Sequence, residues 1–200
     1  MRKLIYYVAC TVDSFIARED GSFDFFLAEG EHLADLVRLF PETVPGHLRE
    51  ALGVTAPNQL FDAVLMGRRT YDVGLNLGVT SPYPHLQQYL FSRSMTQSPD
   101  PSVELVRGDP VARVQQLKTQ PGKDIWLCGG SELAAAIFSE IDELILKVNP
   151  VMLGSGIPLV AGGIMPAALD LIDSRIYANG FMRLRYGVRH EPEARRRSRS

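Results

Sequence analysis

Short apolar runs alternate along the chain with segments in which apolar residues recur at helical spacing. The first run covers residues 4–12, and a helical periodicity follows over 31–40, after a Gly- and Asp-rich stretch over 18–30. A continuous apolar run of this length is typical of a strand that is buried on both faces of a sheet. Similar runs predict further strands over 63–66, 87–91, 103–106, 124–128 and 143–149. Apolar spacing and capping residues predict further helices over 46–52, 68–73, 110–120 and 131–139.

The last part of the chain has a different pattern. A Gly- and Pro-rich loop is expected over 150–168, and two segments, 168–178 and 180–189, flank the dipeptide Asn179-Gly180. Asn-Gly is the strongest short-range signal for a tight hairpin. Strands that alternate with helices indicate a largely parallel sheet covered on both faces, to which the hairpin adds an antiparallel edge. The sequence therefore predicts an α/β fold whose ligands bind beyond the carboxyl ends of the strands.

Composition narrows the class of protein. The 200 residues are 46% hydrophobic and 22% charged, which is typical of one globular domain and excludes disorder of the whole chain. The two cysteines are too few for a disulfide framework and fit a reducing, cytoplasmic compartment. No apolar run is long enough to form a membrane-spanning helix, so no membrane partner is expected.

The formal net charge of −2 is distributed unevenly. Residues 189–200 hold five arginines and two glutamates, a charge of +3, which leaves −5 on the rest of the chain. A mildly acidic body argues against a nucleic-acid-binding face. We therefore expect a domain over 1–188 that does not bind nucleic acid, followed by a disordered basic tail over 189–200.

Two segments share one design, in which a buried strand ends in glycine immediately before a helix. The first turn lies at Gly67 and the second at Gly129-Gly130, with Ser131 as the expected helix N-cap. The free N–H groups of a helix start attract an anion, and glycine lets a phosphate approach the backbone closely. One such turn alone is usually a plain connection. Two of them at one sheet edge are expected to bind a diphosphate.

Arg68 and Arg69 directly follow the first of these turns. Their fixed charge and forked donors suit a phosphate monoester, which favours a dinucleotide with a 2′-phosphate, NADP, over NAD. The alternative is that adjacent arginines at a helix start are simply solvated. The pairing of the two turns supports the phosphate site.

Two carboxylates near the end of the first strand are the candidate proton donors. Asp13 directly follows the strand, and Asp24 lies between Phe23 and Phe25, where an aromatic loop would raise the pKa of the carboxyl group. The alternatives are a turn residue at position 13 and a loop cap at position 24. The four histidines are scattered without metal-ligand spacing, so no metal site is expected.

Four motifs in the same order along the chain resemble the dihydrofolate reductase-like superfamily. The closest branch contains the reductase domain of the bifunctional riboflavin-biosynthesis deaminase/reductase. The motifs are 12–17 (VDSFIA), 63–71 (AVLMGRRTY), 127–133 (LCGGSEL) and 150–159 (PVMLGSGIPL). The sequence departs from that branch at Asp13-Ser14, where Asp-Gly is usual and glycine would allow a positive φ. No residue of the first helix matches the carboxylate that holds a pterin, so folate reduction is not expected.

The resemblance implies a three-layer αβα fold around a mixed, mostly parallel eight-stranded sheet with an antiparallel C-terminal strand. It implies NADPH as the hydride donor, a homodimer, and a cis peptide bond between Gly129 and Gly130. Ala9 and Ile16 would flank the nicotinamide, and the substrate pocket would include Phe25, Leu153 and Gly154. The cofactor-binding residues implied in this way are Ala9, Ile16, Gly67, Arg68, Arg69, Thr70, Ser92, Arg93, Gly129, Gly130, Ser131, Glu132 and Leu133.

The first hypothesis for function is an NADPH-dependent reductase. It would transfer hydride to a small heterocyclic substrate, pteridine- or pyrimidine-like, or to a carbonyl compound. Asp13 or Asp24 is the expected proton donor, and water is the alternative. The second is a non-catalytic nucleotide-binding module on a reductase-like fold. A third, nucleic-acid binding through the basic tail, predicts an affinity that falls steeply with salt.

Overall fold

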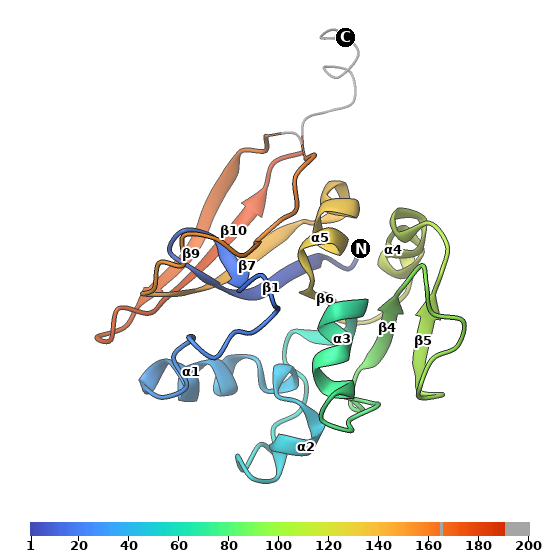
Figure 1. The fold of residues 1–200 in the computed structure, drawn as a ribbon, viewed down its shortest axis with the longest axis horizontal. Helices are drawn as coiled ribbons and strands as arrows, with labels where there is room; N and C mark the ends of the chain where they lie inside the picture. The colour runs from blue at the N-terminus through green and yellow to red at the C-terminus, as the bar shows by residue number, and fades with distance from the viewer. Residues whose placement is uncertain (165, 191–200) are drawn as a thin grey trace, which may run out of the picture.

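An eight-stranded sheet organises the computed structural model, which describes residues 1–164 and 166–190 (Figure 1). The strand order is β5-β4-β3-β6-β1-β7-β10-β9, with parallel pairing from β5 to β7 and antiparallel pairing of β10 with both of its neighbours. This arrangement confirms the predicted mixed sheet with an antiparallel C-terminal hairpin. The strands are β1 (Leu4–Thr11), β3 (Phe61–Gly67), β4 (Gln87–Phe91), β5 (Val103–Val106), β6 (Asp124–Gly129), β7 (Glu143–Asn149), β9 (Leu169–Ile176) and β10 (Met182–Val188).

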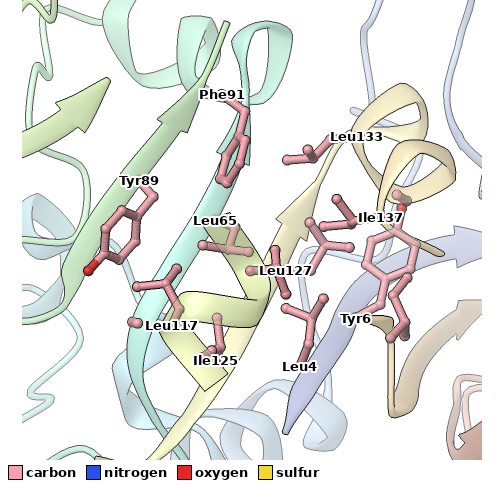
Figure 2. Close-up of a cluster of buried hydrophobic side chains, with 14 of the residues drawn as sticks. Leu4, Tyr6, Leu65, Tyr89, Phe91, Leu117, Ile125, Leu127, Leu133 and Ile137 are labelled. Atoms are coloured by element: carbon pink, nitrogen blue, oxygen red, sulfur yellow. The ribbon is translucent and has the colours of Figure 1, made fainter. Parts of the chain in front are cut away.

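Helices cover both faces of the sheet, which gives the three layers. Leu117 of α4 (Pro110–Thr119) and Leu133 of α5 (Ser131–Ala136) belong to one buried cluster with Tyr6, and Figure 2 shows these side chains spread over the central strands around Leu127. Leu36 of α1 (Glu31–Leu39) and Tyr71 of α3 (Arg68–Leu75) belong to a second cluster on the opposite face. The remaining elements are β2 (Phe15–Ala17), η1 (Pro41–Thr43), α2 (Gly46–Arg49), η2 (Phe138–Glu140) and β8 (Ile157–Pro158).

Several predicted boundaries were wrong by a few residues. The helix expected over 46–52 is only the four-residue α2, and the helix expected over 131–139 ends at Ala136 before the short 3-10 turn η2. The loop predicted over 150–168 contains β8, which pairs with β2 to form a separate two-stranded sheet. Two- and three-residue strands leave no periodic signal in a sequence, because pairing with a distant segment creates them.

The segment 41–60, which the sequence pattern left largely unassigned, is organised by one carboxylate. Glu42 is fully buried and accepts hydrogen bonds from the backbone N–H groups of Gln59 (3.0 Å), Leu60 (2.7 Å) and Phe61 (2.7 Å). A buried charge is tolerated only when it is well hydrogen-bonded. Glu42 therefore fixes the entry of the chain into β3.

The predicted hairpin is confirmed, with β9 and β10 joined by a turn that contains Asn179-Gly180. Gly180 has a φ of 83°, and Tyr177 donates its N–H to the carbonyl of Phe181 at 2.9 Å. The disordered tail predicted from residue 189 lies outside the described residues from position 191 onward. Within 1–164 and 166–190, no helix combines the length and apolarity that crossing a bilayer requires.

Candidate functional site

The predicted cofactor residues follow neighbouring strands along one edge of the sheet. Gly67 at the end of β3 pairs with Phe91 at the end of β4, and Met66 pairs with Gly129 at the end of β6. Because β4, β3, β6 and β1 are consecutive in the sheet, their carboxyl ends form a continuous row. The structure therefore brings together the predicted segments around residues 67, 92 and 129.

The two strand–glycine–helix turns are in direct contact. A Cβ atom added to Gly67 would lie 3.1 Å from the backbone nitrogen of Gly130, and one added to Gly129 would lie 3.2 Å from Oγ1 of Thr70. Gly129 has a φ of 146°, a backbone conformation that residues with a side chain rarely adopt. Its peptide bond to Gly130 is cis, as the resemblance implied. The turns leave no room for side chains on their inner surfaces, so backbone atoms line this part of the edge.

The two arginines after Gly67 have different partners. Nε of Arg68 donates to both carboxylate oxygens of Asp72, at 2.7 and 2.8 Å, one helical turn along α3. Arg69 is exposed, and its guanidinium lies 3.9 Å from the carboxylate of Glu132 at the start of α5. An exposed pair at this distance contributes little to stability. Arg69 is therefore the more accessible of the two cations, and it lies between the two helix starts.

The expectation that Ser131 caps α5 was wrong. Gly130 occupies the N-cap position without a side-chain hydrogen bond, and Ser131 is the first helical residue. The Oγ atom of Ser131 is buried and has no hydrogen-bond partner among the described residues. Buried hydroxyls normally have a partner, so this one is a free donor beside the Gly129-Gly130 turn.

Ser92 and Arg93 follow β4 at the far end of the same row. Ser92 is buried, and its Oγ accepts the backbone N–H of Met95 at 3.1 Å, whereas Arg93 is exposed. At the other end of the row, Ala9 of β1 is half-buried and pairs with Lys147 of β7. Ile16, also half-buried, packs against the cluster beneath α4 and α5.

Asp13 joins the end of β1 to the loop after β7. Its carboxylate accepts hydrogen bonds from Oγ1 of Thr11 (2.6 Å) and from the backbone N–H groups of Leu153 (3.1 Å) and Gly154 (2.8 Å). These bonds, the first of them above all, lower the pKa of Asp13 to about 2. The group is an anion at neutral pH, which suits the alternative interpretation of a structural turn residue better than that of a proton donor.

The expected rise in the pKa of Asp24 was wrong. The side chain is exposed and forms an ion pair with Arg18, whose hydrogen bond lowers the pKa of the carboxyl group. The aromatic neighbours do not enclose it, because Phe25 packs instead on Phe26 at a ring distance of 4.6 Å. The guanidinium of Arg18 also lies 4.8 Å from the centroid of the Phe25 ring.

The stretch 18–30, which contains Phe25, adjoins the loop 150–168, which contains Leu153 and Gly154. Leu153 and Ser155 line a hollow together with Arg18, Glu19 and Asp20.

One ionisable residue at this edge was not among the predicted site residues. Lys147 is half-buried on β7, and its Nζ lies 4.2 Å from the centroid of the Tyr7 ring. Burial lowers the pKa of Lys147 from its ordinary value of 10.5 to about 8. The sequence could have indicated this residue, because Lys147 is the one charged residue in the otherwise apolar run 144–148. A charged residue is unusual in a strand that is buried on both faces.

Comparison with known proteins identifies the family. The family model of the RibD C-terminal domain matches residues 2–182. This chain belongs to the RibD C-terminal domain family. The chain is 34% identical over 163 residues to the uncharacterized protein YwjB of Bacillus subtilis (strain 168), covering 79% of this chain and 82% of YwjB. It is 24% identical over 198 residues to the uncharacterized protein YyaP of the same organism, covering 92% and 94% of the two chains.

Solved structures share the fold of this RibD C-terminal domain. A crystal structure of a Shewanella sp. PV-4 protein assigned to riboflavin biosynthesis matches with a TM-score of 0.69 at 20% identity, covering 95% of this chain and all of the other. The diaminohydroxyphosphoribosylaminopyrimidine deaminase/5-amino-6-(5-phosphoribosylamino)uracil reductase of Thermotoga maritima matches with a TM-score of 0.61 at 12% identity. That match covers 94% of this chain and 57% of the Thermotoga protein. The predicted resemblance and fold class are confirmed, and the family indicates a reductase.

Proposed function

We propose that this protein is an NADPH-dependent reductase of a small heterocyclic substrate with a pyrimidine-like ring. The observation that carries the proposal is the contact between the Gly67 and Gly129-Gly130 turns, in a chain of the RibD C-terminal domain family. The Thermotoga neighbour, by its name a reductase of an aminouracil, supports the pyrimidine-like ring.

The residues along this edge fit a dinucleotide that carries an extra phosphate. Gly67, Gly129 and Gly130 give a phosphate access to the backbone, and the buried hydroxyl of Ser131 lacks a partner among the described residues. The exposed guanidinium of Arg69 offers the charge that a 2′-phosphate requires. Such a cofactor supplies hydride when it is bound, and the chain's own residues bind and orient the reactants.

Titration with NADPH, NADP and NADH tests this proposal, with the fluorescence of Trp126 as the readout. This single tryptophan lies on β6, three residues before Gly129. We expect NADPH to bind more tightly than NADH. We expect the double variant Arg68→Ala, Arg69→Ala to lose about 10- to 100-fold in affinity for NADPH. A charged hydrogen bond to a phosphate contributes about 1.5–3 kcal/mol, and Arg69 is the arginine available to make one, because Arg68 is paired with Asp72.

The double variant Arg38→Ala, Arg107→Ala removes two exposed arginines elsewhere and serves as the matched control. Absence of binding for all three dinucleotides, checked by calorimetry, would contradict the proposal. Binding of NADPH without its oxidation by any pyrimidine, pterin or carbonyl acceptor would instead support a non-catalytic nucleotide-binding module.

We propose in addition that two copies of the chain associate through β9. This strand ends the sheet, so one edge of its backbone has no partner within 1–164 and 166–190, and all eight of its residues are exposed. Antiparallel pairing about Ser174 would place Ile172 opposite Ile176 of a second copy, and Asp173 opposite its Arg175. This register pairs apolar with apolar and acidic with basic side chains, which supports an isologous dimer.

A further inference from the structure

The ammonium group of Lys147 forms no ion pair among the described residues. The Tyr7 ring faces it at 4.2 Å, and the thiols of Cys10 on β1 and Cys128 on β6 are the ionisable groups that affect its pKa. Burial raises the pKa of each thiol to about 11, so both are neutral at pH 7. No carboxylate among the described residues contributes to the pKa of Lys147, so the fold holds this cation without compensating it.

Two further ionisable groups near Lys147 each have a partner of their own. Arg183 of β10 is the cross-strand neighbour of Lys147, and its guanidinium bonds the carboxylate of Asp173 at 2.9 Å. The phenol of Tyr83, whose pKa is raised by burial, contacts the thiol of Cys128. A partly desolvated ammonium without an anionic partner is costly, and the contact with the Tyr7 ring offsets only part of that cost. This arrangement is typical of a group whose partner is a ligand.

Lys147 lies where the substrate of the proposed reductase would meet the cofactor. It pairs with Ala9, which is expected to flank the nicotinamide. Cys128, beside its ammonium, directly precedes the Gly129-Gly130 turn. Lys147 is also near the carboxyl end of its strand, where open α/β sheets bind ligands.

We propose that Lys147 is the catalytic proton donor of this reductase, and that it protonates the carbonyl oxygen or imine nitrogen of the substrate during hydride transfer. This inference rests on the proposed function. A hydride from the dihydronicotinamide forms the new C–H bond, and the π electrons of the C=O or C=N bond move to oxygen or nitrogen. The Nζ–H bond of Lys147 breaks to supply the proton. The neutral amine that remains regains a proton from water before the next turnover.

The protonation state of Lys147 suits this role better than that of the carboxylates. A pKa of about 8 leaves the group mostly protonated at pH 7 and makes it a stronger acid than an ordinary lysine. Asp13 has a pKa of about 2 and Asp24 a lowered pKa, so neither holds a proton to give at pH 7.

The first test compares the wild type with Lys147→Met and Lys147→Arg, using NADPH and 5-amino-6-(5-phosphoribosylamino)uracil, with simple aldehydes as further acceptors. We expect both variants to bind NADPH within about twofold of the wild type and to lose about 100- to 10,000-fold in kcat, the usual contribution of a general acid. Arginine keeps the charge but does not give up its proton, so it separates proton donation from electrostatic attraction. Lys123→Met, which removes an exposed lysine, is the matched control.

The pH profile sharpens this test. Wild-type kcat/KM is expected to fall as pH rises above about 8, because Lys147 loses its proton, and this limb should be absent from both variants. Variants that keep wild-type kcat and the same limb would overturn the assignment of Lys147 while leaving the reductase function intact. Failure of the wild type to oxidise NADPH with any acceptor would overturn both.

A second readout does not depend on turnover. The chain has four lysines (Lys3, Lys118, Lys123 and Lys147), so lysine labelled with 13C at Cε gives few NMR signals, and Lys147→Met identifies the relevant one. We expect this signal to titrate near pH 8, well below the ordinary lysine value of 10.5, and to shift when NADP and 5,6-diaminouracil are added together. A signal that titrates near the ordinary value of 10.5, or that both ligands leave unmoved, would overturn the proposal.

Discussion

At the scale of single residues, partners that are distant in the sequence decide the charge of each ionisable group. Asp24 lies between two phenylalanines in the sequence, which predicted an enclosed carboxyl group. In the fold the group is exposed, and its hydrogen bond with Arg18 lowers its pKa. In the sequence, Asp13 follows a strand and has no evident partner nearby. In the fold, its carboxylate accepts hydrogen bonds from the backbone N–H groups of Leu153 and Gly154, 140 and 141 positions away. Ser14 has a φ of 66°, in the left-handed region that favours glycine, although it carries a side chain.

The stability of Lys147→Met provides a prediction at this scale. Burial of the ammonium lowers its pKa in the fold, so between pH 8 and 10.5 the unfolded chain binds more protons and wild-type stability rises with pH. Below pH 8 the full cost of burial is present. Lys147→Met should therefore raise the free energy of unfolding at pH 7 by about 1–3 kcal/mol, and by less at pH 9.5.

Urea unfolding of the wild type and of Lys147→Met at both pH values measures this difference. A variant that is more stable and less active would identify Lys147 as a residue kept for function at a cost in stability. A Lys147→Met protein that is less stable than the wild type at pH 7 would mean that the contact between the ammonium and the Tyr7 ring stabilises the fold.

At the scale of elements, each strand–glycine–helix unit was readable in the sequence, and their contact was not. The sequence pattern predicted that one helix begins directly after Gly67 and another directly after Gly129-Gly130. The helices α3 and α5 begin at these positions. The contact requires β3 and β6 to be neighbours, although β4 and β5 lie between them in the chain. Strand order is set by packing of the whole sheet, so no local pattern encodes it.

Gly67→Ala tests this contact. Gly67 has a φ of −70°, which alanine adopts freely, so the cost of the substitution comes from packing alone. The new methyl group would lie 3.1 Å from the backbone nitrogen of Gly130 and 3.4 Å from the carbonyl oxygen of Gly129, and neither atom belongs to a flexible side chain. We expect a loss of about 1–3 kcal/mol in the free energy of unfolding and weaker binding of NADPH.

Thermal and urea unfolding measure the loss of stability in Gly67→Ala, and the fluorescence titration measures its affinity for the cofactor. Gly108→Ala is the matched control, because a Cβ atom there meets nothing within 4 Å. Equal stability of Gly67→Ala and the control would be inconsistent with the close approach of the two turns.

At the scale of the whole molecule, the exposed edge of β9 is the feature that favours association with a second copy of the chain. Edge strands in monomeric proteins are usually short or covered, because an unpaired backbone invites further pairing. β9 has eight residues, and four of its large apolar side chains are exposed: Leu169, Leu171, Ile172 and Ile176. In the register about Ser174, a second copy would cover Ile172 and Ile176 and would pair the backbone of both strands over residues 172–176.

The double variant Ile172→Lys, Ile176→Lys should abolish the proposed dimer, because it replaces the apolar pair with two like charges facing each other. Light scattering coupled to size exclusion should give about 44 kDa for the wild type, twice the chain mass of 22.2 kDa, and the monomer mass for the variant. Leu52→Lys, a change at an exposed leucine outside the sheet, should leave the dimer intact. A monomeric wild type would refute the proposal.

The sequence by itself determined the elements of the sheet and the glycine turns, because strands buried on both faces, helix periodicity and turn residues leave local patterns. It also anticipated the hairpin at Asn179-Gly180 and, through four ordered motifs, the family. Tertiary structure alone decided the strand order, the pairing of β2 with β8, and the buried carboxylate of Glu42 that organises 41–60. It alone showed that Asp13 and Asp24 are hydrogen-bonded anions, and that Lys147 forms no ion pair in the part of the chain that the structure describes. The reason is physical: burial and charge neighbours fix a pKa, and both arise between residues that only the folded chain brings together.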